Sequence, residues 1–154
     1  MAIVRRLQQY LEENRIPYRV SHHPEAFTSQ EVAAASHVSG KHLAKVVMVK
    51  SPDGLAMAVL STRHPVDLDK LKVLMEVSEV AFAREEEFAP LLPDCRPGTA
   101  PPFGNLYGRK VYVDREIASQ SELVFQAGTH EDLASLAYAD FARLVEPTVG
   151  DIAK

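Results

Sequence analysis

Two apolar runs joined by a short turn restrict the fold of this chain more than any other feature. Residues 43–49 are rich in valine, residues 55–61 are again apolar, and Ser51-Pro52-Asp53-Gly54 between them has the composition of a turn. Two such runs around a short turn predict a β-hairpin. Because both strands are apolar, further elements must cover them, which favours a sheet inside a domain with a real core.

The rest of the chain alternates between helical and strand patterns. Apolar residues at helical spacing predict helices over residues 2–14 and 67–76, and a capping sequence at Thr28 or Ser29 predicts another that ends near Ser39-Gly40. Shorter patterns indicate strands at residues 18–22, 80–83, 110–113 and 123–126 and helices at 84–92 and 140–146. The sequence therefore predicts one domain over residues 1–154, of the α/β or α+β class, with a mixed central sheet.

The composition argues against several classes of protein. The 154-residue chain has a single cysteine, Cys95, so it can form no intramolecular disulfide and no cysteine zinc site, and its six histidines show no metal-ligand spacing. No apolar run approaches the ~20 residues of a membrane helix, and the first residues do not resemble a signal peptide, so we expect a cytoplasmic protein without membrane contact. With a net charge of −4, any contact with nucleic acid must rest on a local basic patch.

Lys45 stands inside the first apolar run, where a lysine is out of place. Lysines are rarely buried without a partner, and alternation along a strand puts Lys45 on one face with Val47 and Val49. The side chain could end at a cleft and present its charge to a phosphate or a developing oxyanion. It could equally extend into solvent from the start of the strand. Spacing alone leaves both interpretations open.

A proline- and glycine-rich stretch at residues 93–108 is incompatible with a helix or a central strand. Its centre reads Gly98-Thr99-Ala100-Pro101-Pro102-Phe103-Gly104-Asn105. Glycines let a ligand approach the backbone, and prolines fix a loop before the ligand arrives. Such a loop can offer N–H groups to a carbonyl or an oxyanion, although Pro101 and Pro102 cannot donate. A surface turn that only joins two elements is the alternative.

The segment Ala127-Gly128-Thr129-His130 is the third candidate for a site. A glycine before two polar residues at the end of a strand often presents side chains to a cleft. A single histidine is more often structural than catalytic, so the segment alone assigns no role to His130. Cys95 has no histidine near it in the sequence, and we expect an inert thiol there.

Taken together, these segments resemble one family, the YbaK and prolyl-tRNA-synthetase editing-domain type of aminoacyl-tRNA deacylase. The matching segments appear in the family's order and cover about residues 15–146 of the chain. They are Ser21-His22-His23-Pro24, Phe27-Thr28, Glu31-Val32-Ala33, Gly40 to Lys50, Gly98 to Pro102 followed by Phe103-Gly104, and Gly128-Thr129-His130.

The resemblance implies a mixed, strongly curved sheet flanked by helices, and hydrolysis of mischarged aminoacyl-tRNA without a metal or organic cofactor. It implies that Lys45 is the essential lysine, that Gly98 and Pro102 shape the pocket and position the ester carbonyl, and that His130 lies in the pocket. We therefore expect these four residues to be catalytic. The substrate-binding residues that the resemblance implies are Thr28, Thr99, Ala100, Pro101, Phe103, Gly104, Gly128 and Thr129.

The expected partner is the acceptor end of an aminoacyl-tRNA, and an aminoacyl-tRNA synthetase is a second candidate partner. Small amino acids such as alanine, serine or threonine suit an editing pocket, because a pocket selects by excluding what is too large. Two alternatives stay open. The chain could be a non-catalytic module that binds aminoacyl-tRNA or a synthetase, or a small hydrolase that acts on an acyl ester unrelated to tRNA. The sequence leaves the oligomeric state open.

Overall fold

The computed structural model describes residues 4–22, 42–96 and 98–154. The strands in these ranges are β1 Arg19–His22, β2 Leu43–Ser51, β3 Gly54–Ser61, β4 Ala81–Phe82, β5 Lys110–Asp114, β6 Glu122–Gln126, β7 Asp132–Ala137 and β8 Thr148–Gly150. The α-helices are α1 Arg5–Glu13, α3 Leu68–Met75, α4 Glu85–Phe88, α5 Arg115–Ala118 and α6 Tyr138–Val145, and two 3₁₀ turns are η1 Ala89–Leu91 and η2 Gly104–Tyr107. The helix expected between Thr28 and Gly40 lies outside the described residues.

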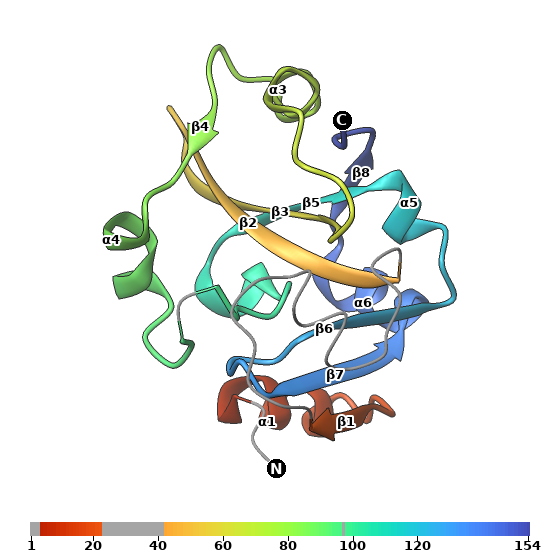
Figure 1. Ribbon diagram of the computed structural model, residues 1–154. Coiled ribbons are helices and arrows are strands. Elements are labelled where there is room, and N and C mark those ends of the chain that lie inside the picture. Colours follow the sequence, from red (N-terminus) through yellow and green to blue (C-terminus); the bar gives the residue numbers. More distant parts are fainter. Residues whose placement is uncertain (1–3, 23–41, 97) are drawn as a thin grey trace.

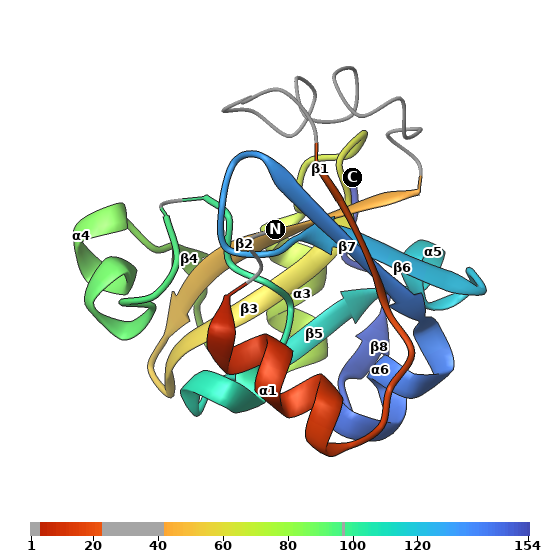
Figure 2. The ribbon, with the colours of Figure 1, turned by 90° about the horizontal axis from the view of Figure 1, so that it is seen from below.

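The strands form one mixed sheet in the order β1-β7-β6-β2-β3-β5-β8, with β4 paired to β2 beside this path. β2 and β3 are antiparallel from Ala44 opposite Ser61 to Ser51 opposite Gly54, which confirms the predicted hairpin. The pairs β2–β6, β3–β5 and β5–β8 are parallel. Figures 1 and 2 show the sheet curving strongly, with helices around it. The predicted α/β class with a mixed, curved sheet is confirmed.

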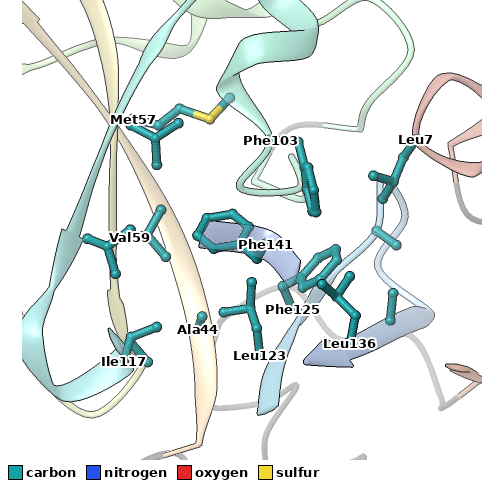
Figure 3. Packing of buried hydrophobic residues seen from close by; sticks show 14 of the residues in the cluster. Leu7, Ala44, Met57, Val59, Phe103, Ile117, Leu123, Phe125, Leu136 and Phe141 are labelled. Carbon is teal, nitrogen blue, oxygen red and sulfur yellow. The ribbon is translucent and has the colours of Figure 1, made fainter. Parts of the chain in front are cut away.

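Apolar side chains cover both faces of the central strands. On one face, Phe103, Phe125 and Phe141 meet Met57 and Val59 of β3, as Figure 3 shows. On the other face, a smaller cluster forms around α3; its strand residues include Val49, Ala56, Ala58 and Leu60. β3 is therefore buried on both sides, which explains why its sequence is an apolar run rather than an alternating one.

Several predicted elements are shorter than expected or were not expected at all. The helix predicted at residues 84–92 is α4 followed by the turn η1, because Pro90 has no N–H with which to continue an α-helix. The strands β7 and β8 were not predicted from the sequence. Among the described helices, none has both the length and the apolar composition that crossing a bilayer requires.

An opening in the sheet begins where β2 and β6 separate. β6 pairs with β2 only at Leu43 and Ala44, and β4 meets the same edge of β2 only at Val49 and Lys50. Between these two short pairings, none of the described strands lies beside this edge of β2. The three segments singled out in the sequence all come to this opening.

Candidate active site

Two of the predicted segments are hydrogen-bonded to each other beside the opening. The N–H of Arg96 donates to the carbonyl of Gly128 at 3.0 Å, and the N–H of Gly128 donates to the carbonyl of Thr99 at 2.8 Å. The Gly98 loop, defined here as residues 98–104, is thereby held against the turn that follows β6. Because β6 lies beside the start of β2, Lys45 is at the same end of the sheet.

The first half of the Gly98 loop leaves two backbone donors available. Thr99 is fully buried, and its N–H and Oγ1 both donate to the carbonyl of Arg96, at 3.1 and 2.6 Å. None of the described residues accepts a hydrogen bond from the N–H of Gly98 or of Ala100. Gly98 has a φ of +80° with open space around it, so the backbone conformation, not crowding, is what demands glycine. Two free N–H groups in a fixed loop can stabilise a carbonyl oxygen.

The second half of the Gly98 loop belongs to the hydrophobic core. Pro101, Pro102, Phe103 and Gly104 are all buried. The Phe103 ring lies 5.3 Å from the ring of Phe141 between centroids, and a Cβ on Gly104 would come within 2.6 Å of the carbonyl oxygen of Arg109. The structure thus places the Phe103 side chain in the core instead of at a surface that a ligand could reach. These residues anchor the loop.

A small apolar cavity of about 50 Å³ lies between the open edge of β2 and the Gly98 loop. Its lining residues come from β2, from α4 and η1, and from the segment around Gly98; they are Val46, Met48, Phe88, Ala89, Leu92, Cys95, Arg96, Gly98 and Ala100. A dry cavity of about 150 Å³ holds a benzene molecule. This cavity therefore has room for only a few non-hydrogen atoms.

Lys45 lies beside the opening, but on the face of β2 that points away from the cavity. Val46 and Met48 face the cavity and the larger core, whereas Val47 and Val49 pack in the cluster around α3, which confirms the predicted alternation. Lys45 is half-buried, and it forms no ion pair with any of the described residues. Desolvation by burial lowers the pKa of its ammonium group. Its charge is therefore not fully in water, and none of the described carboxylates neutralises it.

The half-buried charge of Lys45 should affect the free energy of unfolding. The folded state disfavours the ammonium form, so Lys45→Met should unfold with an equal or higher free energy than the parent at pH 7. The parent holds fewer protons when folded, so its stability should rise as pH increases from the lowered pKa toward 10.5. The difference in the free energy of unfolding between Lys45→Met and the parent should therefore shrink over that range. Urea unfolding at pH 7 and pH 9.5 would measure it, and a clear loss of stability in Lys45→Met at pH 7 would contradict it.

The turn that carries His130 is organised by a buried carboxylate. Asp132 is 3% exposed; its Oδ2 accepts from Thr129 Oγ1 at 2.7 Å, and its Oδ1 lies 3.3 Å from His22 Nδ1. Thr129 Oγ1 also accepts the backbone N–H groups of Glu131 and Asp132. His130 is 8% exposed at the centre of this turn. Asp132 was not among the residues predicted from the sequence, although a threonine hydroxyl that bonds the backbone a few residues later is a known turn signal.

Three other residues considered in the sequence, Gly128, Thr28 and Cys95, differ in where they lie. Gly128 has a φ of +103°, and a Cβ there would collide with Val4, so α1 approaches this turn very closely. Thr28 lies outside the described residues. Cys95 lines the cavity, and burial raises the pKa of its thiol to about 11, which fits the expectation of an inert thiol.

Comparison with known proteins identifies the family. The model of the aminoacyl-tRNA editing domain matches residues 23–144, which is most of the chain. No curated protein matches the sequence.

Solved structures with a similar fold have low sequence identity. A protein described as a candidate trans-editing enzyme for prolyl tRNA synthetase has a TM-score of 0.83 and 22% identity, covering 98% of this chain and 96% of that one. The hypothetical protein APE2540 has a TM-score of 0.86 and 19% identity, covering 97% and 99%. A scaffold from a study of computational epitope grafting has a TM-score of 0.84 and 22% identity, covering 98% and 96%. At these identities the similarity establishes the fold. From the match of the family model, the chain belongs to the aminoacyl-tRNA editing domain family.

Proposed function

We propose that this protein hydrolyses the ester bond of mischarged aminoacyl-tRNA that carries a small amino acid. The observation that carries the proposal is the small apolar cavity beside a loop with two N–H groups that donate to none of the described residues, at the opening next to Lys45. Membership of the editing-domain family supports a tRNA-linked aminoacyl ester as the substrate. The partner is then the acceptor end of the tRNA, and a synthetase that delivers it is a further candidate.

The reaction requires positioning more than a strong nucleophile, because an aminoacyl ester is already activated. In this proposal the ester carbonyl oxygen accepts hydrogen bonds from the N–H groups of Gly98 and Ala100, which stabilise the negative charge as the tetrahedral intermediate forms. Lys45 contacts the terminal phosphate or the same oxygen from the other side of the opening. Water attacks the carbonyl carbon, and the ribose oxygen leaves with a proton. His130 orients the α-amino group or the attacking water.

The size of the cavity supports selection of a small amino acid side chain. Its wall is mostly apolar, and Arg96 is the only charged residue among the described residues that line it. A methyl or hydroxymethyl group fits a space of about 50 Å³, the slightly larger side chain of threonine fits less well, and the side chains of leucine and phenylalanine do not fit. Each additional methylene group changes discrimination by about 1–3 kcal/mol. Alanine, serine and threonine are therefore the expected amino acids, in order of increasing size.

A panel of tRNAs, each charged with a different amino acid, tests the proposed function directly. We expect release of alanine and serine, weaker release of threonine, and none of leucine or phenylalanine. Binding of the charged tRNAs without release of any amino acid would instead identify a non-catalytic module. Equal hydrolysis of a simple alanine ester with and without excess uncharged tRNA would point to a hydrolase that does not recognise tRNA.

Filling the cavity should change which amino acids are released. Ala89→Leu adds three carbons to the wall, so we expect release of threonine and serine to fall by about tenfold or more, and release of glycine to stay close to parental. Rates of release from the tRNA panel would measure the change. Ala81→Leu, which adds the same bulk on exposed β4, is the control. A uniform effect on all amino acids would contradict a side-chain role for the cavity.

A further inference from the structure

The N-terminal helix α1 makes specific contacts with both segments of the candidate site, although the family match begins only at residue 23. The N–H of Val4, just before α1, donates to the carbonyl of Ala127 at 3.0 Å. Arg6 and Tyr10 extend from α1 to the other segment, where Asn105 donates to the Tyr10 hydroxyl at 3.0 Å. Figure 2 shows α1 lying across this end of the molecule.

Arg6 joins the two ends of the stretch that contains the Gly98 loop. Its Nε lies 3.4 Å from Asp94 Oδ2 before the loop, and its Nη1 donates to the carbonyl of Leu106 at 3.1 Å after the loop. The guanidinium also lies over the ring of Tyr107, 4.7 Å from the centroid. A planar group with several donors can make these three contacts at once, whereas an ammonium group cannot.

Tyr107 connects the same group of contacts to the wall of the cavity. Its hydroxyl donates to Asp94 Oδ1 at 3.0 Å and lies 3.4 Å from the sulfur of Cys95, which lines the cavity. Burial raises the pKa of the phenol and of the thiol, so both groups stay protonated at neutral pH. The cluster is therefore a fixed set of contacts behind the cavity wall, without a group that exchanges protons in the reaction.

We propose that Arg6 is a positioning residue of the site, which fixes the Gly98 loop and the cavity wall through Asp94 and Tyr107. The proposal rests on the proposed function. The N–H groups of Gly98 and Ala100, which donate to none of the described residues, can stabilise the oxyanion only if they stay aimed at the place where it forms. Small displacements of such groups reduce rates by large factors. Arg6 acts at a distance from the substrate, by holding both ends of the loop.

Three substitutions test this role. In Arg6→Met and Tyr107→Phe, kcat for deacylation of mischarged tRNA should fall by about tenfold or more with KM close to parental. Arg6→Lys keeps the charge beside Asp94 and should retain an intermediate rate. Arg5→Met is the matched control, because Arg5 is exposed and forms no ion pair with any described residue. An unchanged kcat in both folded variants would overturn the proposal.

Hydrogen exchange separates positioning from general stabilisation and from the proposed function itself. The amides of Thr99 and Gly128 donate within the site, so their exchange should become about tenfold faster in Arg6→Met, while the amides of β3 stay protected. Loss of protection in β3 to the same extent would mean that Arg6 stabilises the whole fold and not the loop in particular, and it would overturn the proposal. If the parent protein released no amino acid, the proposed function would fail, and the exchange pattern would still decide whether Arg6 holds the loop.

Discussion

Replacing Lys45 with alanine is expected to lower the rate of deacylation by about 10²–10³-fold while the protein stays folded. The ammonium group is half-buried beside the opening, and no described carboxylate neutralises it. A charge in such a place interacts more strongly with a phosphate or an oxyanion than a charge in bulk water does. Because no described residue pairs with this charge and burial disfavours it, its removal should affect the reaction far more than the structure.

The control for Lys45→Ala is a lysine that, like Lys45, forms no ion pair with the described residues but does not lie at the opening. Lys72 in α3 fits, because it forms no ion pair with the described residues and none of the described cavity-lining residues belongs to α3. Lys72→Ala should keep the parental rate. Single-turnover release from a mischarged tRNA, together with a thermal unfolding curve for each variant, measures both effects. Near-parental activity of a folded Lys45→Ala would remove this lysine from the mechanism.

Phe103→Ala should reduce the free energy of unfolding by about 3–5 kcal/mol. The ring is fully buried, with centroids 5.3 Å from Phe141, 5.7 Å from Phe125 and 6.3 Å from Tyr10, so its removal leaves a large hole in the core. The residue also ends the rigid half of the Gly98 loop. We therefore expect the folded fraction of this variant to lose activity as well. Urea unfolding and activity per folded molecule measure the two effects.

Phe82→Ala is the matched control, because the Phe82 side chain is 52% exposed on β4. Truncation of an exposed side chain usually changes stability by about 0.5 kcal/mol or less. If Phe103→Ala were as mild as Phe82→Ala, the aromatic cluster would not hold the loop in place, and the loop would need another anchor.

The sequence was sufficient to predict the features that depend on neighbouring residues. The hairpin follows from two apolar runs and a turn, and the alternation within it correctly separated Lys45 from Val46 and Met48. The rigid loop at Gly98 follows from the local chemistry of glycine and proline. Each of these predictions needs only a few consecutive residues, which is why it could be made from the sequence.

Features assembled from distant segments could not be predicted in this way. The segment Asp132–Ala137 contains no run of β-branched residues, and it becomes β7 because β1 and β6 pair with its two edges. Phe88 and Ala89 carry no signal of a binding site, yet they form one wall of the cavity. The sequence carries no signal that Arg6 in the first helix contacts Asp94 and Tyr107, which lie far along the chain.

The pairing of β1 with β7 has a consequence for how the molecule is made. Arg19 lies opposite Ser135, so β1 cannot pair with β7 until more than a hundred further residues have been synthesised. The backbone contact between Val4 and Ala127 has the same delay. Contacts between such distant residues form slowly. The candidate site can therefore be completed only after the chain has been synthesised as far as β7.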